Sequence, residues 1–128
     1  MLSYFDSNCM IGRNVIFQKG SFFSTERLIR EMDYFGIEEA LVFHSLSKEY
    51  HPKVGNRRLL DEVKARDRLH GCWALLPSGT EEMDSPEMVV REMLQNGIRV
   101  VRLFPESHLY RLSGWCMGDT LSVLEKHR

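Results

Sequence analysis

The sequence predicts an α/β protein built from about four parallel strand–helix units. The first indication is a rhythm that repeats along the chain: a short apolar stretch, a polar loop, then an amphipathic helical pattern. The second is an asymmetry, because long loops follow the strands and tight turns follow the helices. Functional side chains of such folds lie on the loops after the strands, so we expect one end of the sheet to hold the site.

The first unit has clear helix signals. Its strand is expected from Leu2 to about Asn8, and its loop from Ile11 to Phe23. Ser24 suits the start of the following helix, and Gly36 suits its end. Between them lies an apolar stripe at helical spacing, formed by Leu28, Ile29, Met32 and Phe35.

The second unit has a short strand and a polar loop. The strand is expected from Ala40 to Phe43 and ends in His44, and the loop runs from Leu46 to Gly55. Asn56 is the residue expected to cap the second helix. The apolar stripe of this helix consists of Leu59, Leu60 and Val63.

The third strand, Leu69 to Leu76, is nearly all apolar, as expected for a strand covered on both faces. Asp84 or Ser85 caps the third helix, and Pro86 suits its first turn. The stripe of this helix consists of Met88, Val89, Met93 and Leu94.

The fourth strand is expected from Ile98 to Phe104. A long loop, Glu106 to Met117, follows it, and the last helix starts near Asp119. The apolar residues of that helix are Leu121, Val123 and Leu124.

The length of the chain sets two alternatives for its architecture. A closed eight-stranded barrel needs about 250 residues, roughly twice the 128 present here. Residues 1–128 are therefore either a single domain that forms the N-terminal half of a barrel, which we favour, or a small open sheet complete in itself. A half barrel leaves its concave face and two strand edges uncovered, and so predicts self-association or a missing C-terminal half.

Composition excludes several classes of protein. Hydrophobic residues make up 43% of the chain and charged residues 27%, which is typical of a globular domain. The net charge of -1 without a basic stripe argues against nucleic acid as a partner, and no apolar run is long enough to span a membrane. The 3 cysteines, which are Cys9, Cys72 and Cys116, lack metal-ligand spacing and indicate reduced thiols in the cytoplasm.

Short motifs along the whole chain resemble those of one family of hydrolases. They are Phe5 to Gly12, Gly55-Asn56, Trp73 to Pro77 and Gly97 to Pro105. Together they are similar to the amidohydrolase-related family, whose members are metal-dependent hydrolases and decarboxylases on a (β/α)8 barrel. That family opens with Asp-x-His-x-His followed shortly by Gly, and Asp6 and Gly12 match this opening.

The chain departs from the family at the metal site. The resemblance implies a divalent metal such as zinc, but the two histidines of the opening motif fall on Asn8 and Met10. An amide oxygen is a weak ligand, and a thioether suits soft ions such as Cu(I). The family's later ligands, two histidines and an aspartate, would lie beyond Arg128. We therefore expect no metal site within these residues.

Asp6 and Asn8 are the first candidates for binding substrate. They lie two residues apart in the first strand, where side chains alternate between the two faces, so both are expected to face one side. The resemblance implies that Asp6 orients groups in a pocket, and the alternative is that it caps a loop backbone. Asn8 could hydrogen-bond a substrate carbonyl or serve as a structural amide.

The other candidates follow the second and fourth strands. His44 is the histidine best placed for acid–base catalysis, or it bridges the strand end to its loop. Arg102 lies in an apolar run, where it could hold a substrate carboxylate or pair with a carboxylate such as Asp6. Glu106 and His108 could form an acid–base pair, or they could be ordinary polar residues of a loop.

The resemblance implies that the full-length protein hydrolyses a carbon–nitrogen or ester bond, or decarboxylates an acid, on a small polar or carboxylated substrate. We expect these residues by themselves to be inactive. The alternative is a non-catalytic binding or scaffold module, which the loss of the histidine pair favours. An open flavodoxin-like sheet is a third possibility, but the first loop offers no glycine-rich or hydroxyl-rich phosphate cradle.

Overall fold

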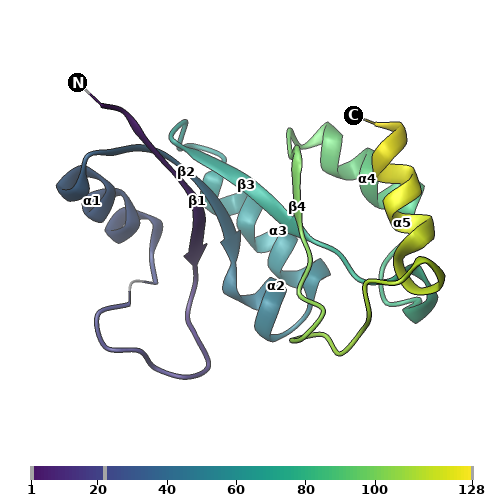
Figure 1. Cartoon of the computed structure of the whole chain (residues 1–128). Coiled ribbons are helices and arrows are strands. Elements are labelled where there is room, and N and C mark those ends of the chain that lie inside the picture. The colour runs from purple at the N-terminus through teal and green to yellow at the C-terminus, as the bar shows by residue number, and fades with distance from the viewer. Residues whose placement is uncertain (1, 22, 128) are drawn as a thin grey trace.

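The computed structural model describes residues 2–21 and 23–127 and contains one parallel sheet. The strand order is β1-β2-β3-β4, and every neighbouring pair runs parallel. The strands are β1 (Tyr4–Ile11), β2 (Ile37–His44), β3 (Leu69–Ala74) and β4 (Val100–Arg102). The sheet curls like half of a (β/α)8 barrel (Figure 1), which confirms the predicted fold class.

Helices lie between successive parallel strands, as a strand–helix repeat requires. The longer ones are α1 (Thr25–Phe35), α3 (Pro52–Val63), α4 (Pro86–Gln95) and α5 (Gly114–Lys126). Two short elements, α2 (Ser45–Glu49) and the 3-10 helix η1 (Ser78–Thr80), follow the ends of β2 and β3. Helix α1 packs on β2, α3 packs on β2 and β3, and α4 packs on α5 beside β4 (Figure 1). No helix in the described part of the chain is long and apolar enough to cross a membrane.

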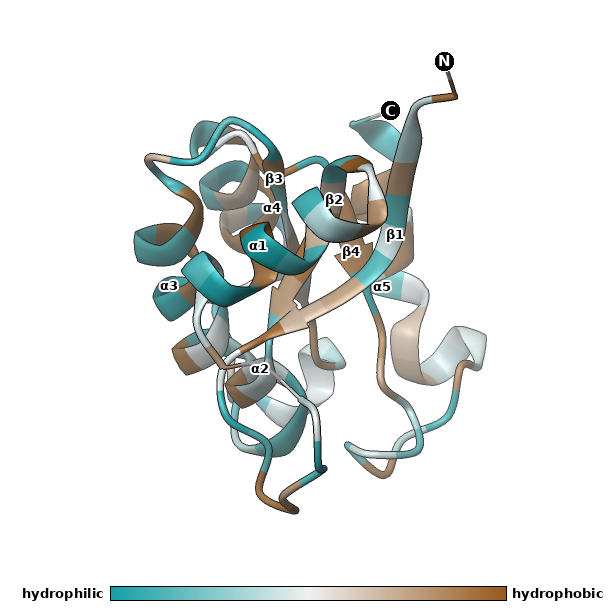
Figure 2. Cartoon of the chain, turned by 90° about the vertical axis from the view of Figure 1, so that its left-hand side faces the viewer, coloured by the Kyte–Doolittle hydropathy of each residue, from teal (hydrophilic) through white to brown (hydrophobic). Residues whose placement is uncertain are grey.

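Alternation along the strands separates two faces of the sheet. Ala40 and Val42 of β2 and Trp73 of β3 belong to the hydrophobic core beneath the helices, together with Leu28, Met32, Leu59, Val90 and Met93 from the helices. The outward turns of α1 are hydrophilic (Figure 2). The opposite side chains make up what we call the inner face, whose residues are Met10, Phe43, Cys72, Arg102 and Phe104.

The caps predicted for α1 are confirmed, but its apolar stripe is shorter than expected. The Ser24 hydroxyl accepts the Arg27 backbone N–H at 3.3 Å, and Gly36 ends the helix with φ of 68°. Phe35 is 64% exposed, so its assignment to the buried stripe is wrong. It lies edge-on against the ring of Tyr34, which is exposed as well.

The predicted start of the second helix is also wrong. The expected loop contains α2, and α3 begins at Pro52, whose fixed φ suits a first helical position. His51 caps α3, because its Nδ1 accepts the Lys53 backbone N–H at 3.1 Å. Asn56 therefore lies inside the helix and does not cap it.

The buried amide of Asn56 joins α3 to the end of β3. Its Nδ2 donates to the Ala74 carbonyl at 2.8 Å, and its Oδ1 accepts the Ala74 N–H at 2.9 Å. The same oxygen accepts the Ser47 hydroxyl of α2 at 3.2 Å. Gly55 allows this close approach, since a Cβ there would lie 2.1 Å from the Ser47 backbone nitrogen.

The fourth unit differs from the prediction at both ends. Strand β4 covers only Val100–Arg102, the stretch that is in register with Cys72–Ala74 of β3, and not the expected Ile98 to Phe104. Helix α5 begins at Gly114 and not near Asp119. Glycines at 114 and 118 made this first turn resemble a loop in the sequence.

We predict that Asn56→Ala strongly destabilises the fold. The substitution leaves the buried N–H and C=O of Ala74 without partners, which costs roughly 2–4 kcal/mol of unfolding free energy. Asn96→Ala is the matched control, because the exposed Asn96 amide bonds only the Glu92 carbonyl. Urea unfolding followed by circular dichroism measures both. Equal losses in the two variants would contradict the role assigned to Asn56.

Candidate functional site

Arg102 is a cation at the carboxyl end of β4, on the inner face. Its guanidinium carbon lies 4.9 Å from the centroid of the Phe43 ring, in cation–π contact. Within the described residues no carboxylate forms an ion pair with Arg102, so the expected alternative of a pair with Asp6 is wrong. A half-buried guanidinium stacked on a ring keeps its N–H donors available to an anion.

Aromatic rings extend from Phe43 along the strand ends. The centroids of Phe43 and Phe104 are 5.1 Å apart, those of Phe104 and His108 are 5.8 Å apart, and those of His108 and Tyr110 are 6.4 Å apart. A second cation joins this aromatic row, because Lys48 Nζ lies 5.9 Å from the Phe104 centroid. The end of the sheet therefore combines two cations with flat apolar surfaces.

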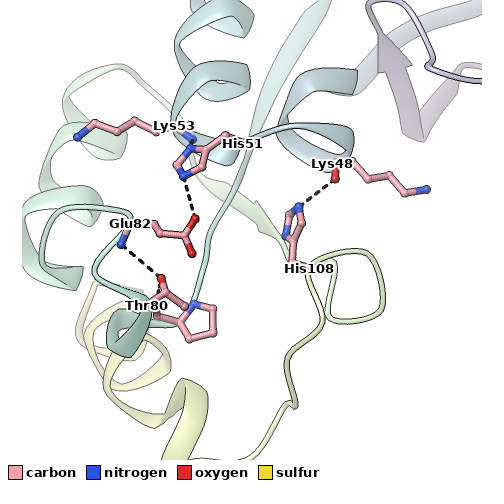
Figure 3. A network of polar contacts seen from close by, with 7 residues as sticks. Lys48, His51, Lys53, Thr80, Glu82 and His108 are labelled. Atoms are coloured by element: carbon pink, nitrogen blue, oxygen red, sulfur yellow. Dashed lines mark hydrogen bonds and ion pairs between the residues drawn. The ribbon is translucent and has the colours of Figure 1, made fainter.

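His108 fastens the loop after β4 to α2. The ring nitrogen Nε2 of His108 bonds the Lys48 backbone carbonyl at 3.0 Å (Figure 3). The backbone N–H of His108 donates to the Phe104 carbonyl at 2.9 Å. The other ring nitrogen, Nδ1, is buried and has no hydrogen-bond partner among the described residues.

Tyr110 is half-buried beside His108, and its hydroxyl oxygen is buried. Burial raises the pKa of its hydroxyl, and the backbone amide of Phe104 opposes that rise. In the described part of the chain no hydrogen bond of ordinary geometry satisfies the hydroxyl. The sequence offered one signal for this residue, an aromatic side chain on a loop after a strand.

Glu106 does not join this site. Its side chain is exposed, and no hydrogen bond or ion pair links it to His108 within residues 23–127. The expected acid–base pair of Glu106 and His108 is therefore not formed. His108 faces α2 instead, because its loop turns back toward Lys48.

A β-bulge separates Asp6 from Asn8. Asp6 is in register with Ala40 and Cys9 with Val42, so β1 carries one extra residue between them. The expectation that Asp6 and Asn8 share one face is therefore wrong, because the bulge resets the alternation. The two oxygens of Asp6 close the bulge: Oδ1 accepts the Asn8 N–H at 2.9 Å and Oδ2 accepts the Cys9 thiol at 3.1 Å.

The two buried thiols are poor nucleophiles. Burial, the hydrogen bond to Asp6 and the charge of Asp6 together raise the pKa of Cys9 to about 12. Burial raises the pKa of Cys72 to about 11, against the opposing charge of Arg102. Both residues therefore serve packing rather than covalent chemistry.

His44 lies on the helix-covered side of the sheet and not on the inner face. It follows Ala40 and Val42 in the alternation of β2 and is only 6% exposed. Its Nδ1 accepts the Leu46 N–H at 3.1 Å, as in the bridging role considered as the alternative. Burial lowers the pKa of His44, the charge of Glu62 opposes this, and the charge of Arg58 adds to the lowering. A barrel interior would not contain this histidine, contrary to expectation.

The residues at the family's histidine positions do not fit a zinc ion. Asn8 is exposed within the bulge, and Met10 pairs with Phe43 in the sheet. An amide oxygen and a thioether are not a donor set that zinc prefers. Among the described residues no group of three histidine, cysteine or acidic side chains lies close enough to hold a metal.

Comparisons with protein-family models, with curated proteins and with solved structures find no match to this chain. The resemblance to the amidohydrolase-related family therefore stays a hypothesis that rests on the motifs of the sequence.

We predict that Cys116 is the thiol that reacts first with iodoacetamide in the native chain at pH 8. Cys116 is half-buried, whereas Cys9 and Cys72 are buried and have raised pKa values. Mass spectrometry of timed samples gives the three rates, and guanidinium denaturation should equalise them. Asp6→Ala should accelerate the labelling of Cys9 by opening the bulge. Native labelling of Cys9 as fast as that of Cys116 would contradict the assignment.

Proposed function

We propose that this chain binds a small carboxylated molecule at the inner face, as part of a barrel-like hydrolase or decarboxylase related to the amidohydrolases. The observation that carries the proposal is Arg102, a guanidinium at a strand end that stacks on Phe43 and has no carboxylate partner among the described residues. Arginine binds carboxylates through two parallel hydrogen bonds, which fixes both the position and the orientation of a small acid.

The surroundings of Arg102 support the same substrate class. Lys48 adds a second positive charge over Phe104, and the ring row offers flat surfaces for the body of the molecule. The Nδ1 of His108 and the hydroxyl of Tyr110 offer further polar contacts. An acid bound to Arg102 would therefore find cations, rings and hydrogen-bonding groups at one end of the sheet.

The described residues supply no step that requires a metal. Asn8 and Met10 do not fit zinc, and Asp6 uses both oxygens to close the bulge. What these residues contribute to the proposed enzyme is recognition of the acid, and catalytic groups would come from strands outside the four described here. The three free cysteines fit a reducing compartment, which supports a cytoplasmic protein.

The second candidate is a non-catalytic module that binds the same kind of acid. The observation that favours it is the pair Asn8 and Met10, since neither side chain is suited to activating water. Turnover of a carboxylated amide or ester by the full-length protein distinguishes the two candidates, because a binding module would release the substrate unchanged.

Binding of benzoate tests the proposal. We expect benzoate to bind the chain and the neutral benzamide to bind at least 10-fold more weakly. Arg102→Met should lower the affinity for benzoate by about 10-fold or more, and a 10-fold loss corresponds to about 1.4 kcal/mol of binding free energy. Arg99→Met is the matched control, because Arg99 is exposed just before β4. Chemical-shift titration measures all of these. Unchanged affinity in Arg102→Met, or equal binding of benzamide, would remove the proposal.

We also predict that residues 1–128, expressed by themselves, self-associate. Strands β1 and β4 are the two edges of the sheet, and β1 leaves Tyr4 and Phe5 more than half exposed. Light scattering at increasing concentration should give a mass that rises above that of one chain. Phe5→Lys should reduce the association. A constant single-chain mass at high concentration would refute the predicted self-association.

A further inference from the structure

A cavity opens at the same end of the sheet, on its helix-covered side. Its volume is about 610 Å³, which suits a small ligand. The ends of β1 and β2 form its floor, and α3 forms one wall. It is separate from Arg102 and the aromatic row, since none of those residues lines it.

Two buried polar groups form the floor of the cavity. Ser45 is fully buried, and its hydroxyl has no hydrogen-bond partner in the described part of the chain. His44 lies beside it, and because its Nδ1 accepts the Leu46 N–H, its neutral ring carries the proton on Nε2. Gly12 closes the floor tightly, since a Cβ there would lie 2.5 Å from the Ser45 hydroxyl. A buried hydroxyl without a partner is costly, and a bound acceptor would remove that cost.

The rim of the cavity is rich in cations. Arg13, Arg57 and Arg58 line it, and none of them forms an ion pair with a carboxylate of the described residues. The guanidinium of Arg13 lies 5.6 Å from the centroid of Phe23, which gives the rim one flat apolar surface. Two carboxylates also line the cavity, Asp61 and Glu62. One of them, Glu62, already accepts the Thr25 hydroxyl at 2.9 Å.

We propose that this cavity binds a small phosphorylated polyol, such as a sugar phosphate. A phosphate group presents three strong acceptor oxygens, which match the arginines of the rim and the Ser45 and His44 donors of the floor. The carboxylate of Asp61 would accept hydroxyl groups of the polyol, and the Phe23 ring would cover its less polar face. A single carboxylate ligand would leave more of these donors unmatched.

The test compares three probes on the 128-residue chain by isothermal titration calorimetry. We expect ribose 5-phosphate to bind, inorganic phosphate to bind more weakly, and ribose to bind at least 10-fold more weakly than its phosphate. Arg58→Gln should lower the affinity for ribose 5-phosphate by 10-fold or more. Arg30→Gln, on the exposed side of α1, should leave that affinity unchanged.

Ser45→Ala separates binding from folding. Because the Ser45 hydroxyl has no partner, its removal should leave the midpoint of urea unfolding unchanged or higher while it weakens ribose 5-phosphate. Arg102→Met should leave this binding intact, which keeps the result independent of the carboxylate site. Equal binding of ribose and ribose 5-phosphate, no heat at millimolar ribose 5-phosphate, or full affinity in both Arg58→Gln and Ser45→Ala would each overturn the proposal.

Discussion

The fold depends on one buried side chain, the amide of Asn56. It satisfies both backbone groups of Ala74, and Ala74 is the β3 residue in register with Arg102 of β4. The same amide holds the Ser47 hydroxyl, and the next residue of α2, Lys48, offers its carbonyl to His108. Two hydrogen bonds, joined through the backbone of Ser47 and Lys48, thus link α3 through α2 to the loop after β4. The position of the inner-face site therefore depends on a residue that touches none of its rings.

The features that the sequence predicted well are local ones. The four parallel strand–helix units, the cap at Ser24 and the glycine at Gly36 were each predicted from a few neighbouring residues, and the structure contains them. Asn56 was misassigned because an asparagine near a helix start usually caps it, and only the distant Ala74 gives this amide its buried role. Tertiary contacts decide such positions, so no local pattern identifies them.

The positions of the site residues were harder to predict than the fold, because the register of a strand decides on which face of the sheet each side chain lies. A single extra residue in β1 turns Asp6 toward Cys9 and under the helices, away from the inner face. His44 follows the alternation of β2 to the same covered side. Arg102 lies on the inner face without an ion pair among the described residues, so its predicted role in binding a carboxylate stays a prediction. A β-bulge cannot be recognised from the composition of a strand, whereas a charged residue within an apolar strand can be seen directly in the sequence.

Three buried polar groups without partners lie at the end of the sheet where we propose binding. The Ser45 hydroxyl, the His108 Nδ1 and the Tyr110 hydroxyl are all buried without hydrogen-bond partners among the described residues, and all three follow the carboxyl ends of strands. Each such group costs roughly 1–3 kcal/mol, so their gathering at one end is expensive for a small fold. Three further buried groups of the described residues also lack partners, namely the Trp73 indole N–H and the hydroxyls of Ser113 and Thr120. Asn56, in contrast, satisfies both backbone groups of Ala74. What sets the Ser45 hydroxyl apart is therefore its place, because it lies on the floor of a cavity whose rim carries three arginines without ion pairs among the described residues. A ligand with acceptor oxygens would satisfy this hydroxyl and the arginines together, which is the physical basis of the proposed phosphate site.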